Sequence, residues 1–375
     1  MKIFNYILVG GILILTQCQD ASNLSSIPSV KVDVTENKEG KTSDYFTCSE
    51  IIVLETCENS LISSIDRLIR TENNIYILDK SRKQIFIFDH HGKFIKALNH
   101  RGRAPGEYIQ IVDAGVDTLN KQIIVMADIP MCILYYDLQG NFIKQKPLPH
   151  LLDNIICENG KEFFYNTYYK EDKKKDYYIW FSEVLDCRKE LPLQKNNNFF
   201  LKGPRIINSS GILFTKRYDN TVFSLKNDTI TPEIRFDFGE NNIPPHLKEN
   251  LNDKKFYLEC MQKKICHSVS YLRNNERFIT FKTNFGGFII YDKPENKASY
   301  FKYMKDEESG LIFSTYFPHD GADNRMLFTM NANQFLDLFY NLTSVREANN
   351  EFIQNLGTIL KEDDNPILFF YKFKT

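Results

Sequence analysis

Two stretches of this sequence repeat each other at a constant spacing. Residues 75–96 and residues 123–144 align without a gap, so that Asp89 corresponds to Asp137 and an aromatic residue, an acid and a glycine recur in register. Each copy holds three short runs rich in β-branched and aromatic residues, separated by turn residues. Such runs favour strands, and a repeat of about 40–50 residues made of several short strands is typical of folds in which each unit is one small sheet. The repeat therefore predicts a series of small antiparallel sheets.

The strands of one unit can be placed from the positions of its turns. The first unit is predicted to hold four strands, from the innermost to the outermost, at residues 64–70, 75–78, 85–89 and 94–98. Gly92 stands where a tight hairpin requires a positive φ, which costs other residues more. Weaker copies follow at residues 162–193, 211–238 and 277–304, and a last unit starts at Arg325. We therefore predict an all-β fold: a six-bladed β-propeller of four-stranded antiparallel blades.

The propeller needs a closing device and tolerates insertions. An open ring would leave two unpaired strand edges that invite aggregation. Residues 51–54 and residues 366–373 both have strand composition, so we expect the two chain ends to share the sixth blade. Residues 245–268 and 345–360 carry apolar residues at helical spacing instead, and we expect them to form small helical insertions that pack on the propeller.

The first residues have the pattern of a targeting signal. Lys2 is followed by an apolar run over residues 3–15, which is short for a membrane span. The run leads to Cys18, and Leu-Thr-Gln-Cys resembles a bacterial lipoprotein signal in which the cysteine carries the lipid. Gln17 replaces the usual small residue, which leaves an uncleaved anchor or an ordinary signal peptide as alternatives. The predicted order is a lipoprotein signal peptide, a flexible tether and the propeller, at residues 1–18, 19–46 and 47–375.

Charge and cysteine content limit the classes of function. The chain has 47 basic and 48 acidic residues, a formal net charge of -1, so no overall field attracts nucleic acid. Its 8 cysteines form no Cys-x-x-Cys pair, and an odd number remains once Cys18 is set aside. We expect buried free thiols, with at most one bridge, such as Cys48 to Cys57.

Several motifs of the first unit and one near the chain end carry a family resemblance. They are residues 74–79, 85–89, 92–94 and 101–108, and the Asp-Asp-Asn-Pro sequence that begins at Asp363. Together they resemble the six-bladed β-propeller lipoprotein family of Bacteroides and relatives. The resemblance implies a propeller held by lipid at the outer membrane, facing the periplasm or the cell exterior. It implies no defined activity, because that family is poorly characterised.

The string Arg-Gly-Arg-Ala-Pro-Gly-Glu-Tyr at residues 101–108 is the strongest candidate for a binding site. In a four-stranded blade, the loop that leads to the next blade lies on the same face as the loop between the second and third strands, here residues 79–83. The predicted ligand-binding residues, which would hold an anionic or polar ligand, are Arg101, Arg103, Glu107, Tyr108, Lys80 and Arg82. The alternative is a structural turn in which Glu107 pairs internally with an arginine.

A metal-dependent enzyme is the second hypothesis. Propeller lactonases gather carboxylates from several blades around a central ion, and Asp79, Asp113, Asp117 and Asp128 are the candidates here. Aspartates at hairpin ends more often accept hydrogen bonds from turn amides, and the histidines have no metal-ligand spacing. No GxSxG, P-loop, HExxH or Rossmann motif occurs. We therefore predict no metal site and no cofactor, and the sequence identifies no catalytic residue, although residues that converge on the propeller axis could still form a catalytic site.

These patterns favour a binding or scaffold protein over an enzyme. The sequence predicts a cell-envelope lipoprotein, attached to a lipid bilayer through Cys18, that recognises a glycan or a peptide. The alternative function is a metal-assisted hydrolase or lactonase with its site in the central channel. A third hypothesis is a structural subunit of an envelope protein complex.

Overall fold

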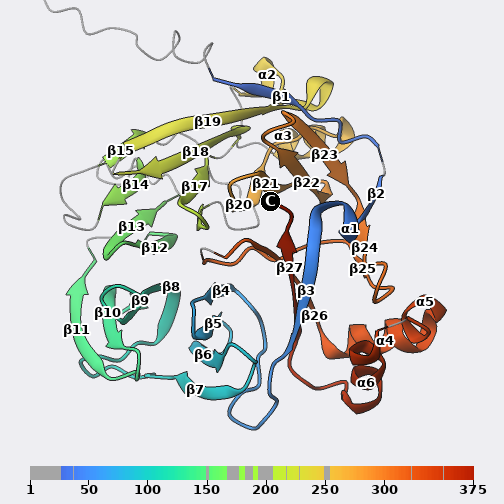
Figure 1. Cartoon of the computed structure of the whole chain (residues 1–375). Coiled ribbons are helices and arrows are strands. Elements are labelled where there is room, and N and C mark those ends of the chain that lie inside the picture. Colours follow the sequence, from blue (N-terminus) through green and yellow to red (C-terminus); the bar gives the residue numbers. More distant parts are fainter. Residues whose placement is uncertain are drawn as a thin grey trace, which may run out of the picture.

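The structure, a computed structural model, describes residues 27–36, 38–148, 152–166, 177–181, 189–192, 206–216, 218–227, 229–248, 254–321, 323–348 and 350–375. Its sheets form a ring of six blades, and the strands of each blade are ordered from the axis to the rim (Figure 1). The six-bladed propeller predicted from the repeat is confirmed.

The first two blades follow the repeat strand for strand. Neighbouring strands within each blade are antiparallel. Blade 1 consists, from the axis outward, of β4 (Arg67–Arg70), β5 (Asn74–Asp79), β6 (Gln84–Asp89) and β7 (Phe94–Leu98). Blade 2 consists of β8 (Gln110–Asp117), β9 (Gln122–Ile129), β10 (Cys132–Asp137) and β11 (Phe142–Pro147).

Blades 3 to 5 keep the same order of strands. Blade 3 holds β12 (Asn154–Glu158), β13 (Lys161–Tyr165), β14 (Tyr177–Phe181) and β15 (Lys189–Pro192). Blade 4 holds β16 (Ile206–Asn208), β17 (Ile212–Thr215), β18 (Thr221–Lys226) and β19 (Thr229–Asp237). Blade 5 holds β20 (Val269–Asn274), β21 (Phe278–Thr283), β22 (Gly286–Asp292) and β23 (Lys297–Phe301).

Blade 6 combines the C-terminal strand with a strand from the N-terminal part of the chain. It contains β26 (Arg325–Met330), β27 (Ile367–Phe373) and β3 (Phe46–Val53), and a single bridge from Phe317 to Leu327 stands in for the innermost strand. β27 pairs antiparallel with β3, with Leu368 opposite Ile52. This pairing leaves neither β27 nor the ring with an open edge.

The recurring acid and glycine of the repeat form the same turn in both blades. The side chain of Asp89 accepts hydrogen bonds from the amides of His91 and Lys93, each 2.9 Å away. Asp137 accepts one from the amide of Asn141 at 2.8 Å. The glycines that follow, Gly92 and Gly140, have φ values of 88° and 83°, a region that strains residues with a side chain.

The middle strands are apolar on both faces because each blade is packed between two others. In β5, Ile75 and Ile77 pack with residues of blade 6, including Leu327. The alternate residues, Tyr76 and Leu78, pack with residues of blade 2. Successive strand residues point to opposite faces, so each blade extends the core to the next.

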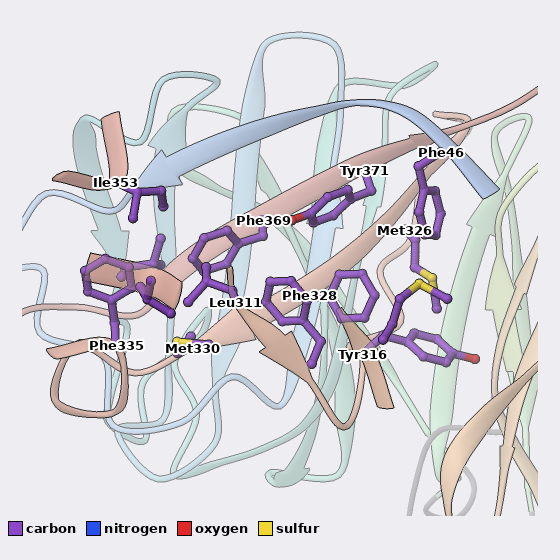
Figure 2. Packing of buried hydrophobic residues seen from close by; sticks show 14 of the residues in the cluster. Phe46, Leu311, Tyr316, Met326, Phe328, Met330, Phe335, Ile353, Phe369 and Tyr371 are labelled. Carbon is purple, nitrogen blue, oxygen red and sulfur yellow. The ribbon is translucent and has the colours of Figure 1, made fainter. Parts of the chain in front are cut away.

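The largest core cluster joins blades 5 and 6 to a helical insertion. Figure 2 shows Phe328 and Phe369 of blade 6 among its aromatic rings, with Phe335 and Ile353 of the helices beside them. The insertion consists of α4 (Ala332–Asn341), α5 (Thr343–Arg346) and α6 (Glu351–Ile359). A second insertion consists of η3 (Gly239–Asn241), α2 (Pro245–Lys248) and α3 (Lys254–Gln262), and it encloses a smaller cluster that includes Leu247 and Phe256. The predicted helical insertions are therefore present.

The segment expected to be a flexible tether is partly folded, which corrects that boundary. It contains β1 (Ser29–Lys31), β2 (Glu39–Lys41) and α1 (Thr42–Tyr45). β1 extends blade 4 by pairing parallel with β19, and β2 pairs parallel with β24 (Tyr303–Lys305), next to β25 (Ile312–Phe313). The polar composition of the segment misled the prediction, because edge pairing uses backbone groups and needs only single buried residues such as Val30.

The structure also tests the disulfide bridge expected from the sequence. Cys57 is a free, exposed cysteine, so the expected bridge from Cys48 to Cys57 is wrong. The remaining free thiols of the described chain are Cys132, Cys157, Cys260 and Cys266. Helices long and apolar enough to span a bilayer are absent from the described residues. Cys18 and the rest of the predicted signal peptide lie outside the described residues.

Candidate functional site

A cavity of about 770 Å³ opens at one end of the propeller axis. Blades 1 to 4 contribute the ends of their innermost strands and the loops that follow, through residues such as Arg70, Asp117, Glu158 and Asn208. Blade 6 contributes residues 320–325 of the described chain and Lys372. The cavity volume lies within the roughly 300–1,000 Å³ that small-ligand sites occupy.

Arg67 stands at the cavity wall and ties three blades together. Its Nη1 donates to Asp113 of blade 2 at 2.5 Å and to the carbonyl of Ile155 in blade 3 at 2.6 Å. Its Nε donates to Asp320, just before blade 6, at 2.7 Å. Burial lowers the pKa of Arg67, but the carboxylates of Asp113 and Asp320 outweigh that effect and raise it. Arg67 therefore stays charged, and its contacts with three other segments give it a structural role.

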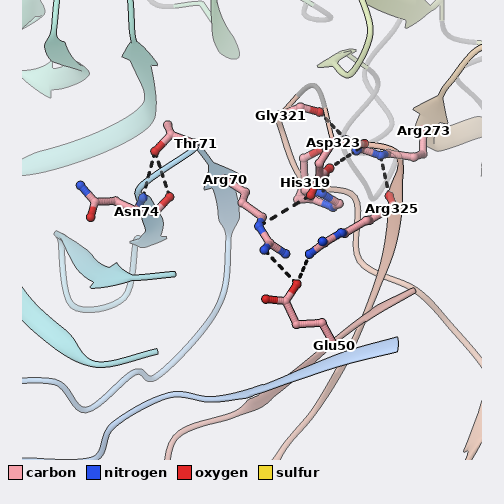
Figure 3. A network of polar contacts seen from close by, with 9 residues as sticks. All are labelled: Glu50, Arg70, Thr71, Asn74, Arg273, His319, Gly321, Asp323 and Arg325. Atoms are coloured by element: carbon pink, nitrogen blue, oxygen red, sulfur yellow. Dashed lines mark hydrogen bonds and ion pairs between the residues drawn. The ribbon is translucent and has the colours of Figure 1, made fainter. Parts of the chain in front are cut away.

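A second polar network lies between blades 5, 6 and 1 (Figure 3). Arg70 donates to Glu50 at 2.9 Å, and Arg325 donates to the same carboxylate oxygen. The fully buried Arg273 donates to the carboxylate of Asp323 and to the carbonyl of His319, the latter at 2.7 Å. The network holds the segment before β26 against blades 5 and 1.

The electrostatics of this network keep Asp323 ionised and His319 neutral. Burial opposes ionisation of Asp323, but His319 and Arg273 outweigh it and lower the pKa of that carboxyl to about 2. Burial, followed by the charge of Arg273, lowers the pKa of His319. The neutral imidazole bonds to Asp323 through Nε2 over 2.7 Å.

Some polar groups of the cavity have no partner among the described residues. The Nη1 atom of Arg70 is buried without an acceptor, and burial lowers the pKa of Arg70. The Glu158 carboxylate forms neither a hydrogen bond nor an ion pair within the described chain, and burial raises the pKa of Glu158. Lys372 is exposed and likewise forms no ion pair with a described residue. The carboxylate of Glu158 and the ammonium of Lys372 are free to bind a ligand, and Arg70, which is paired with Glu50, keeps one unused donor at Nη1.

The residues predicted from the Arg-Gly-Arg string lie at the other end of the axis. The string precedes the start of β8, whereas the cavity is lined by the end of that strand. A strand of 8 residues spans about 25 Å at roughly 3.3 Å per residue, which separates the two sites.

The side chains of the string do not form the expected stacking site. Tyr108 is 0% exposed, so its ring offers no face to a ligand. Glu107 accepts a hydrogen bond from the amide of Ala104 at 2.9 Å rather than pairing with an arginine. Arg82 is exposed, and its Nε donates to Ser63 at 2.8 Å. Arg101 and Arg103 are exposed and Lys80 is half-buried, and their role in binding stays a prediction.

Three of the four aspartates considered for a central metal ion have other partners, and the fourth, Asp128, is exposed. Asp79 accepts hydrogen bonds from the amides of Ser63 and Arg82, and Asp117 accepts one from the amide of Leu119. Asp113 is neutralised by Arg67. Among the residues that the structure describes, no three His, Cys, Asp or Glu side chains converge as metal ligands. The donor set at the axis therefore does not fit a central calcium ion.

The charged cavity residues were missed by sequence reasoning. Residues 64–70 were predicted as an innermost strand, and two arginines in a strand beside the axis were the available signal. Glu158 and Lys372 carried no such signal, because their neighbours across the cavity are distant in sequence.

A family model described as "Domain of unknown function (DUF4934)" matches residues 26–372. The chain belongs to this family. A crystal structure named as an exported protein of Bacteroides fragilis NCTC 9343 has the same fold as this DUF4934 chain. The two structures match with a TM-score of 0.75 at 20% sequence identity, and the match covers 93% of this chain and 100% of that one.

A second crystal structure, a member of the DUF4221 family from Bacteroides vulgatus, matches this DUF4934 chain with a TM-score of 0.46 at 10% identity, over 88% of this chain and 97% of that one. No curated protein matches this sequence.

Proposed function

We propose that this DUF4934 propeller is an exported binding protein that holds a polar ligand, a glycan or a peptide, in its axial cavity. The observation that carries the proposal is a cavity of about 770 Å³ into which several blades direct charged groups. The Nη1 atom of Arg70 is buried there without an acceptor, and the half-buried Glu158 carboxylate forms no hydrogen bond or ion pair with a described residue. Buried polar groups without partners are costly, so a ligand that satisfies them gains affinity and specificity.

The metal-assisted hydrolase is not favoured by the arrangement at the axis. Arg67 lies between Asp113 and Asp320, the carboxylates that a cation would need. A binding role needs no such ion. It uses a preformed concave site on a rigid scaffold, which a closed propeller supplies.

Ligand screening of the purified chain without its first 26 residues tests the binding role. The fluorescence and melting temperature of the protein would be measured in the presence of each member of a glycan library and a tripeptide library. Each ligand that binds would then be measured again with the Glu158→Gln variant. We expect at least one library to give a hit that the variant weakens about tenfold or more. Hits that bind wild type and Glu158→Gln equally, or no hit in either library, would contradict an axial site.

We also propose that the protein is exported and anchored by lipid at Cys18. The signal-like residues 1–18 support this, and so does the fold shared with a protein named as exported. Expression of the full chain in a Bacteroides host with an alkyne-labelled fatty acid tests it. We expect label in the membrane fraction, and Cys18→Ala should remove the label. Unlabelled wild-type protein in the cytoplasm would contradict the proposal.

A further inference from the structure

The two unpartnered charges of opposite sign stand on opposite sides of the cavity. In a ring of six blades, blade 3 lies across the axis from blade 6. Glu158 ends the innermost strand of blade 3, and Lys372 belongs to blade 6; both line the same cavity. Arg70 of the neighbouring blade 1 adds its unpaired Nη1 atom. The group without an ion-pair partner is therefore anionic at blade 3, whereas at blade 6 it is cationic.

The other buried charges of the cavity are paired or hydrogen-bonded within the described chain. Arg67 and Asp320 neutralise each other at 2.7 Å. Asp323 binds Arg273 and His319 through Oδ1, and its Oδ2, which has no hydrogen-bond partner among the described residues, lies 3.7 Å from the Nε of Arg70. Asp117 accepts hydrogen bonds from the amide of Leu119 and from the neighbouring asparagine. Glu72 is exposed in the loop after β4, at the rim.

This arrangement selects for one class of ligand. A purely anionic ligand meets the carboxylate of Glu158, and an uncharged oligosaccharide leaves both sides of the cavity without a counter-charge. A ligand with an ammonium at one end and a carboxylate at the other neutralises both sides at once. A short peptide with free termini has this chemistry.

We propose that the axial cavity binds a short peptide by its two ends, with the ammonium at Glu158 and the carboxylate at Lys372 and Arg70. This inference rests on the proposed function, because it assigns the ligand class of the same cavity. Recognition of both termini would make the site sensitive to the length of the peptide and indifferent to much of its sequence.

A tripeptide library with alanine at both ends and all residues in the middle tests the inference. Its four forms carry free ends, an N-acetyl group, a C-terminal amide or both blocks, and binding is measured by ultrafiltration and mass spectrometry. We expect free-ended tripeptides to bind, and each block to weaken binding about tenfold or more. In Glu158→Gln, acetylation of the tripeptide should no longer weaken binding, whereas the C-terminal amide still should. In Lys372→Met, the amide should no longer weaken binding, whereas acetylation still should.

Matched surface variants control for effects that any loss of a charged side chain would have on binding. Glu240→Gln and Lys93→Met change exposed residues far from the cavity lining and should leave all four affinities unchanged. Circular dichroism melts establish that each variant is folded. Tight binding of the doubly blocked tripeptides, or equal penalties in wild type and Glu158→Gln, would overturn the inference.

The outcomes separate the inference from the proposed function. If only glycans bind and Glu158→Gln weakens them, the cavity is a binding site but its ligand is not a peptide, and the inference fails alone. If neither tripeptides nor glycans bind, the inference and the proposed function fail together.

Discussion

The Nε atom of Arg67 lies 2.7 Å from a carboxylate oxygen of Asp320, and this ion pair joins the first blade to the segment that leads into the last. The same guanidinium reaches Asp113 in blade 2 at 2.5 Å. Both carboxylates are buried. Closure of the ring therefore depends on charge at the axis as well as on strand pairing at β3 and β27.

Loss of Arg67 should destabilise the propeller strongly. Arg67→Met leaves two buried carboxylates without a counter-charge, and removal of one partner of a buried ion pair costs about 3–5 kcal/mol. Urea unfolding of the purified propeller measures the loss. Neutralising the partners in the triple variant with Asp113→Asn and Asp320→Asn should recover part of the stability. A loss below about 1 kcal/mol for the single variant would contradict the role assigned to Arg67.

The two equivalent glycines of the repeat should respond differently to alanine. Both have positive φ, so each substitution carries a backbone strain of about 1–2 kcal/mol. An added Cβ at Gly92 would lie 2.5 Å from the carbonyl oxygen of Val53, whereas at Gly140 the nearest atom is the Cδ1 of Leu98 at 3.2 Å. Gly92→Ala should therefore lower the urea midpoint more than Gly140→Ala. Equal shifts would show that the close approach to Val53 is relieved without cost.

Acid should destabilise the native state through His319. The imidazole is buried against Asp323, Arg273 and Arg70, and burial lowers its pKa below the ordinary value of 6.5. The unfolded chain gains a proton as the pH falls through 6.5 while the native chain does not, so this contribution to stability is present above 6.5 and is lost below it. Unfolding free energies between pH 7.5 and 4.5 should fall less in His319→Gln than in wild type. A parallel fall in both proteins would contradict a neutral buried His319.

Tyr108 should prove to be a core residue and not a ligand contact. Its side chain is fully buried, and its hydroxyl donates to the carbonyl of Leu98 at 3.3 Å. Tyr108→Ala should cost about 3–5 kcal/mol, as large-to-small aromatic substitutions do. The exposed neighbour offers a control: Arg103→Ala should change the stability by no more than about 0.5 kcal/mol. Calorimetry and urea titration compare the two, and a stable, folded Tyr108→Ala protein would count against this view of the string.

Much of the fold could be predicted because its rules are local. The turn at Asp89 and Gly92 requires one carboxylate and one residue that tolerates a positive φ. Both occur within four consecutive residues of the sequence. The gapless repeat of strand runs and turns at residues 75–96 and 123–144 indicated a series of small antiparallel sheets. The tether boundary was misplaced, since β1 is held by backbone pairing to β19, which composition does not reveal.

The candidate site was not predictable in the same way. The string at residues 101–108 looked exposed because it is polar and rich in turn residues, yet the fold buries Tyr108 and turns Glu107 onto its own loop. The cavity that replaces it combines Arg70, Glu158 and Lys372, whose neighbourhood exists only after the ring has closed.

The repeating unit, its strands and its turns could be read from the sequence, because backbone conformation depends on residues close to one another in the chain. Which charges are neutralised and which are left free depends on the tertiary structure. Coulombic pairing depends on distance in space, and the ring brings together side chains as remote as Glu158 and Lys372.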